Sequence, residues 1–143
     1  MTSANADDNS PSVADADGEA APPETIMLSV PAMGPFGRIA RMSGASLALR
    51  RGLSLTAVED LRLAIDEANI LLLGHRDHEG SVDITFELEP NAISIEFVPS
   101  FDDGPPDLSA DALERFSELA GPLLTTFSID SNTGVLRLYK SAS

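Results

Sequence analysis

Cysteine and tryptophan are absent from the 143-residue sequence, and tyrosine occurs once. Without cysteine the chain cannot form a disulfide, a thiolate nucleophile or a cysteine-ligated zinc site, which fits a reducing compartment. No stretch approaches the roughly 18–20 consecutive apolar residues that span a bilayer. The N-terminus lacks the basic and apolar segments of a secretion signal. We therefore expect a cytoplasmic protein with no membrane association.

Basic residues are also scarce. Nine Lys and Arg residues stand against 23 Asp and Glu residues, which gives a formal net charge of −14. Direct binding to nucleic acid or to an anionic membrane depends on dense Lys and Arg surfaces, so both are disfavoured, whereas a basic protein partner would be attracted. With 43% hydrophobic and 22% charged residues, the chain otherwise has the composition of one ordinary globular domain.

The first 24 residues, MTSANADDNSPSVADADGEAAPPE, differ from the rest. They include six acidic residues and no basic residue. Such a segment buries too little apolar surface to offset the entropy cost of ordering, so residues 1–24 are predicted to be a disordered acidic tail. A solubilising role is the simplest one, and a partner-mimicking or autoinhibitory role is the alternative. Residues 25–143 then form the domain, with 17 acidic against 9 basic residues.

Alternation of apolar and polar residues predicts five strands, over residues 25–30, 81–89, 92–98, 126–130 and 135–139. Residues 90–91 join the second and third strands as a hairpin, and residues 99–107 form a connection rich in Pro, Gly and Asp.

Three helices lie between these strands. A Pro- and Gly-containing break over residues 31–35 opens the first, which runs to about Arg51, where Gly52 can provide a left-handed cap. Ser109 can cap the third helix, and residues 121–122 should end it. The order β-α-α-β-β-α-β-β favours an α+β fold, a two-layer sandwich of one mostly antiparallel sheet with its helices on one face.

The second helix has the clearest pattern. Thr56 and Glu59 read as a capping box at its start, and Arg62 and Asp66 have the spacing of a helix ion pair. Apolar residues at steps of three and four predict its core-facing side, namely Val58, Leu61, Ile65, Ala68 and Leu72.

The string VEDLRLAIDEA, residues 58–68, resembles the N-box helix of the anti-sigma factor serine kinases of the RsbW type, in the GHKL ATP-binding superfamily. Arg41 precedes it at the separation that this family shows, and FSIDSNTGVLRLYK, residues 127–140, resembles the family's final hairpin. The resemblance covers about residues 25–140. It implies a GHKL, or Bergerat-like, fold for an anti-sigma regulatory domain.

In that family, such proteins bind a sigma factor and keep it from RNA polymerase. Many also use ATP and Mg²⁺ to phosphorylate a serine of an anti-anti-sigma protein with the STAS fold. By resemblance, Glu67 corresponds to the general base, which accepts the serine proton. Arg41 corresponds to an arginine that grips the sigma factor.

The sequence departs from the family pattern at the metal ligand. The family places a Mg²⁺-binding asparagine four residues after the glutamate, where this chain has Leu71, and a hydrocarbon cannot bind the ion. Asn69 lies about 200° around the helix from Glu67 and so cannot substitute in this register.

The nucleotide motifs differ as well. Instead of Asp-x-Gly-x-Gly directly after the third strand, Asp102, Asp103 and Gly104 follow slightly late, as a weak candidate for nucleotide contact. Only residues 105–108 separate them from the third helix, so the Gly-rich lid is missing, and residues 113–117 lack the paired glycines that cradle phosphate. We therefore expect that ordinary ATP binding is lost and that neither ATP nor Mg²⁺ is a cofactor. Glu67 is then a vestigial base, or a helix carboxylate that is either solvated or paired with an arginine.

Arg38 and Arg41 are the predicted partner-binding residues, on the most basic helix of an acidic protein. The alternative is a solvated face, with Arg50 and Arg51 stabilising the helix C-terminus. His75, Asp77 and His78 have metal-ligand chemistry, but their loop spacing without a further ligand predicts no metal site. The apolar run of residues 70–73 is a candidate contributor to a homodimer, which is common in the similar family.

The leading hypothesis is therefore an anti-sigma factor that sequesters a sigma factor by stoichiometric binding and is antagonised by a competing STAS-domain protein in a stress response. An active serine kinase with Asp66 or Asn69 as a replacement Mg²⁺ ligand is the first alternative. A pseudokinase-like module that binds an unrelated signalling partner is the second.

Overall fold

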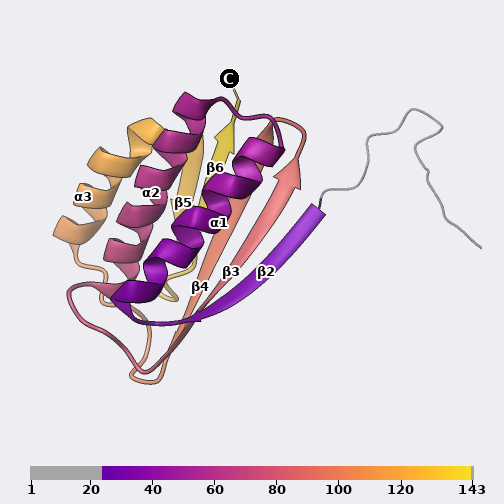
Figure 1. Ribbon diagram of the computed structural model, residues 1–143. Helices are drawn as coiled ribbons and strands as arrows, with labels where there is room; N and C mark the ends of the chain where they lie inside the picture. The colour runs from indigo at the N-terminus through magenta and orange to yellow at the C-terminus, as the bar shows by residue number, and fades with distance from the viewer. Residues whose placement is uncertain (1–23, 143) are drawn as a thin grey trace, which may run out of the picture.

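Five strands and three helices follow one another along residues 24–142, the part of the chain that the computed structural model describes (Figure 1). Two short 3-10 turns complete the order: β2 (Glu24–Pro31), η3 (Gly34–Phe36), α1 (Gly37–Arg50), α2 (Leu55–Leu73), β3 (Gly80–Glu89), β4 (Ala92–Phe101), α3 (Ala110–Ala120), η4 (Gly121–Leu123), β5 (Thr126–Ile129) and β6 (Leu136–Ser141). The predicted order of strands and helices is confirmed. The predicted tail lies outside the described residues except for Glu24, which begins β2.

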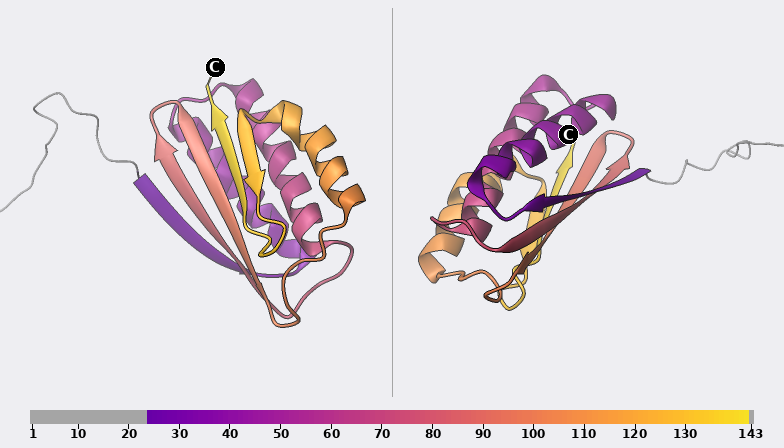
Figure 2. Two further views of the ribbon diagram at one scale, coloured as in Figure 1. Left: turned by 180° about the vertical axis from the view of Figure 1, so that it is seen from behind. Right: turned by 60° about the horizontal axis from the view of Figure 1, so that its bottom comes forward.

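The strands form one antiparallel sheet in the order β2-β3-β4-β6-β5. All three helices lie against the same face of this sheet, and the view from behind shows the strands in front of them (Figure 2). The predicted α+β two-layer sandwich is therefore confirmed. Within residues 24–142, no helix is both long enough and apolar enough to cross a membrane.

The core lies between the helices and the sheet. Alternate residues of β3 point toward the helices and are almost fully buried, including Ile84 and Phe86. The predicted apolar side of α2 is buried as well, with no member more than 4% exposed: Val58, Leu61, Ile65, Ala68 and Leu72. Because burial of a large aliphatic side chain stabilises a fold by about 1.5–3 kcal/mol, this stripe fixes which side of α2 faces the sheet.

Helix α1 approaches the core through small residues. Ala40, Gly44 and Ala48 recur every four positions and are buried. A Cβ atom added to Gly44 would lie 2.6 Å from Cδ1 of Ile65, so the two helices are in close contact at this point. The close approach fixes the rotation of α1 and leaves Met42, on its opposite side, 61% exposed.

The start of α2 differs from the prediction. The N-cap is Ser54, whose backbone is extended and whose Oγ accepts a hydrogen bond from the N–H of Ala57 at 3.1 Å. Thr56 lies inside the first turn of the helix, so the predicted Thr56–Glu59 capping box is wrong. The physical reason is that an N-cap needs non-helical backbone angles, and Ser54 is the residue that has them.

Strand β4 also runs further than predicted, through Pro99 to Phe101. Proline cannot donate a backbone hydrogen bond, which normally confines it to places with a free strand edge. Here β6 pairs only with residues 92–97 of β4, so Pro99 has β3 alone as a neighbour and its missing N–H leaves no partner unsatisfied.

Candidate functional site

A cavity of about 950 Å³ lies between α2 and α3, next to residues 74–78. Glu67 and Leu71 line it from α2, and Arg115 and Phe116 line it from α3. Glu67 and Leu71 are one helical turn apart on the N-box-like helix, so this cavity is where the resemblance places catalysis and metal binding.

Glu67 is engaged by an arginine. Its Oε1 accepts a hydrogen bond from Nη1 of Arg115 at 2.6 Å, and its side chain is 19% exposed. Of the interpretations of Glu67 as a base, a solvated carboxylate or an Arg-paired carboxylate, the last describes its contacts. One of the two oxygens that could accept a serine proton is already occupied.

The position of the expected metal ligand is apolar and buried. Leu71 is 6% exposed and contributes only carbon atoms to the cavity. Asp66 Oδ1 accepts from Nη1 of Arg41 at 2.9 Å, and Asn69 Nδ2 donates to the carbonyl of Gly37 at 3.3 Å. Both side chains therefore face α1 rather than the cavity, which leaves neither one positioned as a replacement Mg²⁺ ligand beside Glu67.

The same contacts correct a predicted ion pair. Arg62 pairs with Glu59 at 2.7 Å, three residues away, and Asp66 pairs with Arg41, so the predicted Arg62–Asp66 pair is wrong. Sequence spacing allowed the pair on one helix, but packing of α1 against α2 brings Arg41 to Asp66.

The late Asp-Asp-Gly segment ties two loops together. Asp103 Oδ2 accepts from Nη2 of Arg76 at 2.7 Å, and this hydrogen bond holds the pKa of the Asp103 carboxyl below its ordinary value of 3.8. The N–H of Asp102 donates to the carbonyl of Glu79 at 2.8 Å. Gly104 follows with a positive φ of 107°. Asp103 lines the cavity, but its carboxylate is already committed to Arg76.

The three predicted loop candidates for a metal have separate contacts. His75 is exposed, and Asp77 Oδ1 accepts from the N–H of Gly34 at 3.0 Å. His78 stacks on Phe101 with ring centroids 4.2 Å apart, and its Nε2 lies 2.8 Å from the carbonyl oxygen of Leu73. These side chains do not converge, and no group of three potential ligands is found among residues 24–142.

The charge of the cavity works against a bare polyphosphate. Its lining includes four carboxylates and two arginines, a net charge of −2 with histidine neutral: Glu67, Asp103, Asp107, Asp111, Arg76 and Arg115. The N-terminus of α3 is already capped, because Ser109 Oγ accepts the N–H of Ala112 at 3.1 Å. A nucleoside triphosphate would need a bound cation to enter such a site.

The predicted partner-binding residues lie on α1. Arg38 is exposed, whereas Arg41 is 28% exposed and held by Asp66. Sequence reasoning missed the apolar part of this surface, where Met42 is 61% and Leu49 is 48% exposed. The sequence contained a signal for this surface. Small residues recur every four positions in α1 and mark its buried side, so the residues on the opposite side of the helix are exposed. We call Arg38, Ile39, Met42 and Leu49 the outer face of α1.

The predicted contributor to a homodimer is mostly unavailable. Leu71 and Leu72 are buried, and Ile70 is 40% exposed. A homodimer remains a prediction.

No protein-family model matches the chain. Curated relatives do match. The serine-protein kinase RsbW of Halalkalibacterium halodurans is 29% identical over 105 residues, which cover 71% of this chain and 59% of that protein. Serine-protein kinases RsbW of Bacillus thuringiensis and Bacillus cereus are each 32% identical over 74 residues, 50% of this chain and 46% of theirs. The chain thus spans about half the length of the curated relatives it matches.

The sequence similarity and the fold agree with the motif observed in α2. The resemblance predicted from residues 58–68 is confirmed, and the chain is a homologue of the serine-protein kinases of the RsbW type.

Proposed function

We propose that the chain is an anti-sigma factor that binds a sigma factor through the outer face of α1 and keeps it from RNA polymerase without phosphorylating a partner. The observation that carries this proposal is the state of the catalytic position. Glu67 is bound by Arg115 at 2.6 Å, and one turn later Leu71 offers carbon where a Mg²⁺ ligand is needed.

The requirements of phosphoryl transfer are not met by the residues around Glu67, which supports the proposal. The reaction depends on positioning of the nucleotide and on metal ions that neutralise the phosphates. In this chain the cavity lining has a net charge of −2, and Asp66 and Asn69 face away from it. Loss of ATP and Mg²⁺ binding follows, while the surface of α1 is unaffected.

The outer face of α1 has the composition of a protein-binding surface. It combines exposed apolar side chains with Arg38, and α1 contains three arginines and no acidic residue. Apolar residues that exclude water, together with arginine, contribute most of the binding energy in typical interfaces. A sigma factor bound here in the cytoplasm would be blocked sterically.

Release would follow from competition. A STAS-domain anti-anti-sigma protein that binds an overlapping part of α1 would displace the sigma factor according to relative affinity and concentration. No phosphorylation step is needed in this scheme.

The direct test is a pull-down from the native host with the full chain as bait, followed by identification of the captured proteins. The proposal predicts a sigma factor and a STAS-domain protein, which compete with each other when both are added in purified form. Capture of an unrelated signalling protein alone would contradict it and favour a binding module with another partner.

One observation favours the kinase as a second candidate, namely the cavity of about 950 Å³ beside Glu67. An active kinase would transfer phosphate from ATP to the captured STAS-domain protein, and the transfer would be lost in Glu67→Ala. The anti-sigma proposal predicts no phosphate transfer by the unchanged chain or by Glu67→Ala.

A further inference from the structure

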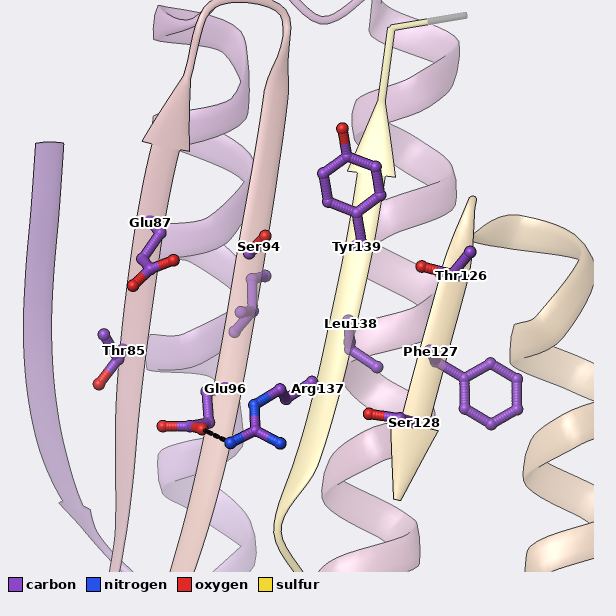
Figure 3. Close-up of a pocket in the computed structure, with 11 residues that line it drawn as sticks. Thr85, Glu87, Ser94, Glu96, Thr126, Phe127, Ser128, Arg137, Leu138 and Tyr139 are labelled. Carbon is purple, nitrogen blue, oxygen red and sulfur yellow. Dashed lines mark ion pairs between the residues drawn. The ribbon is translucent and has the colours of Figure 1, made fainter. Parts of the chain in front are cut away.

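The face of the sheet that faces away from the helices carries an ordered row of oxygen-bearing side chains. The strand register places Glu87 opposite Ser94, Ser94 opposite Tyr139, and Tyr139 opposite Thr126. Figure 3 shows these four side chains next to one another on β3, β4, β6 and β5, with the helices behind the sheet. The row offers one carboxylate and three hydroxyl oxygens as hydrogen-bond acceptors.

A hollow of about 330 Å³ lies along this row. The next register row borders it, where Glu96 on β4 pairs with Arg137 on β6 at 2.6 Å. This ion pair, drawn as a dashed line in Figure 3, takes up the one cation in the lining of the hollow. Glu87 is exposed and has no ion-pair or hydrogen-bond partner for its carboxylate among residues 24–142.

Negative charge extends along β3 on the same face. Asp83, Glu87 and Glu89 lie on this face of the strand and are all exposed, with Thr85 between the first two. Glu96 stands on the neighbouring strand opposite Thr85. Four carboxylates against Arg137 give this face a net charge of −3. Side chains two residues apart on a strand are separated by about 6.6–6.8 Å, so Glu87 and Glu89 lie one such step apart and Asp83 lies two steps from Glu87.

We propose that this surface, which we call the acidic sheet face, docks an extended cationic segment of a partner protein, with one Lys or Arg side chain entering the hollow against Glu87. An extended segment repeats its side chains at the same spacing as β3, so two cations two residues apart meet Glu87 and Glu89, and a third, four residues from the first of these, meets Asp83. A guanidinium or ammonium group has donors only, which match the acceptors of the row, and the ring of Tyr139 adds a cation–π surface.

Charge also selects against other occupants. A second copy of the chain would place two faces of net charge −3 against each other, which disfavours self-association through this surface. The acidic sheet face lies on the opposite side of the sheet from α1 (Figure 2). The inference therefore goes beyond the proposed function, because a partner here leaves α1 free, and its failure would leave the anti-sigma proposal intact.

The test uses the full chain and a synthetic nine-residue peptide of alternating Lys and Thr, with an alternating Glu and Thr peptide as the reference. Affinity is measured by fluorescence anisotropy at about 0.1 M salt, where nonspecific long-range attraction is screened beyond roughly 10 Å. Amide chemical shifts in the nuclear magnetic resonance spectrum locate the peptide on the chain.

A matched pair of variants separates docking from general attraction. Glu87→Gln/Glu89→Gln removes two charges from the acidic sheet face, and Glu114→Gln/Glu118→Gln removes two from the exposed side of α3. We expect roughly fivefold weaker binding of the Lys peptide in the first variant and less than about twofold change in the second, with shifts confined to β3, β4, β5 and β6. All four side chains are exposed, and thermal unfolding checks that both variants fold.

Three results would overturn the proposal. Equally weakened peptide binding in both variants would show that only the net charge of the chain attracts the peptide. The absence of binding by the Lys peptide at millimolar concentration would mean that the face has no such affinity. A dimer seen by light scattering and abolished by the Glu87→Gln/Glu89→Gln variant would assign the surface to a second copy of the chain.

Discussion

Arg115 on α3 donates to Glu67 on α2 across 2.6 Å, although 48 residues separate the two in the chain. The pair joins the two helices that line the cavity, and it binds the one side chain that the resemblance assigns as general base. Beside it, Leu71 continues the apolar core to the point where a metal ligand would have to stand.

Restoring the family's metal ligand should cost stability. Leu71→Asn places an amide at a position that is 6% exposed, and we expect a loss of about 3 kcal/mol in the free energy of unfolding, because apolar burial is lost and a polar group is desolvated. Urea denaturation measures it. Ile70→Asn, at a position 40% exposed, is the control and should cost about 1 kcal/mol or less. Equal costs in the two variants would contradict the packing described for Leu71.

The close packing of α1 against α2 depends on Gly44. Gly44→Val would bring a branched side chain against Ile65, where even a Cβ atom would lie 2.6 Å from Cδ1, and we expect destabilisation by about 1–3 kcal/mol from overpacking. Ser46→Val, on the exposed side of the same helix, should change the urea midpoint little. Indistinguishable midpoints would show that α1 does not pack as described.

Asp103 offers a test by pH. Arg76 lowers the pKa of this carboxyl, so its ionised form favours the folded state above the ordinary value of 3.8, and that contribution is lost as the pH falls through the lower folded-state pKa. Arg76→Gln should raise the pKa of Asp103 toward its ordinary value in a carboxyl carbon titration by nuclear magnetic resonance. Arg62→Gln, which removes the partner of Glu59, should leave it unchanged. The same Asp103 pKa in both variants would exclude the Arg76 hydrogen bond as the cause.

The outer face of α1 can be tested without disturbing the fold. Arg38 is exposed and has no ion-pair partner within residues 24–142, so Arg38→Glu should weaken capture of the sigma factor about tenfold or more while the melting temperature hardly changes. Arg41→Glu is less suitable, because it would place a second carboxylate against Asp66. Arg137→Gln, which removes a positive charge on the opposite face of the sheet without adding a carboxylate beside Glu96, is the control. Equal capture by Arg38→Glu and the unchanged chain would contradict the placement of the interface.

Much of the fold was predictable because it depends on local pattern. Period-two alternation identified five strands, and the three-and-four spacing from Val58 to Leu72 identified the buried side of α2. Predictions from local sequence were wrong where neighbouring residues favoured different ends for a helix or strand. Thr56 and Glu59 match a capping box, but Ser54 provides the cap. Likewise Pro99 reads as a strand breaker, but the end of β6 leaves its side of β4 unpaired.

The contacts that define the site depend on packing between elements, which spacing along one helix does not specify. The pairs Arg41–Asp66 and Arg115–Glu67 each join different helices, so the sequence could name Asp66 and Glu67 but not their partners. The acidic sheet face is similar. Alternation predicts that Glu87 points outward, but only the register of four strands brings Ser94, Tyr139 and Thr126 into one row with it.

We expect that this homologue of the RsbW-type kinases does not use ATP. Isothermal titration calorimetry of the full chain with ATP and Mg²⁺ measures this binding, and Arg115→Ala is titrated in parallel so that Glu67 is also examined without its partner. Because Leu71 cannot bind the cation in either protein, we predict no binding tighter than about 1 mM in both, which corresponds to roughly 4 kcal/mol of binding free energy. Tighter binding that is abolished by Glu67→Ala or Asp102→Ala would contradict the account.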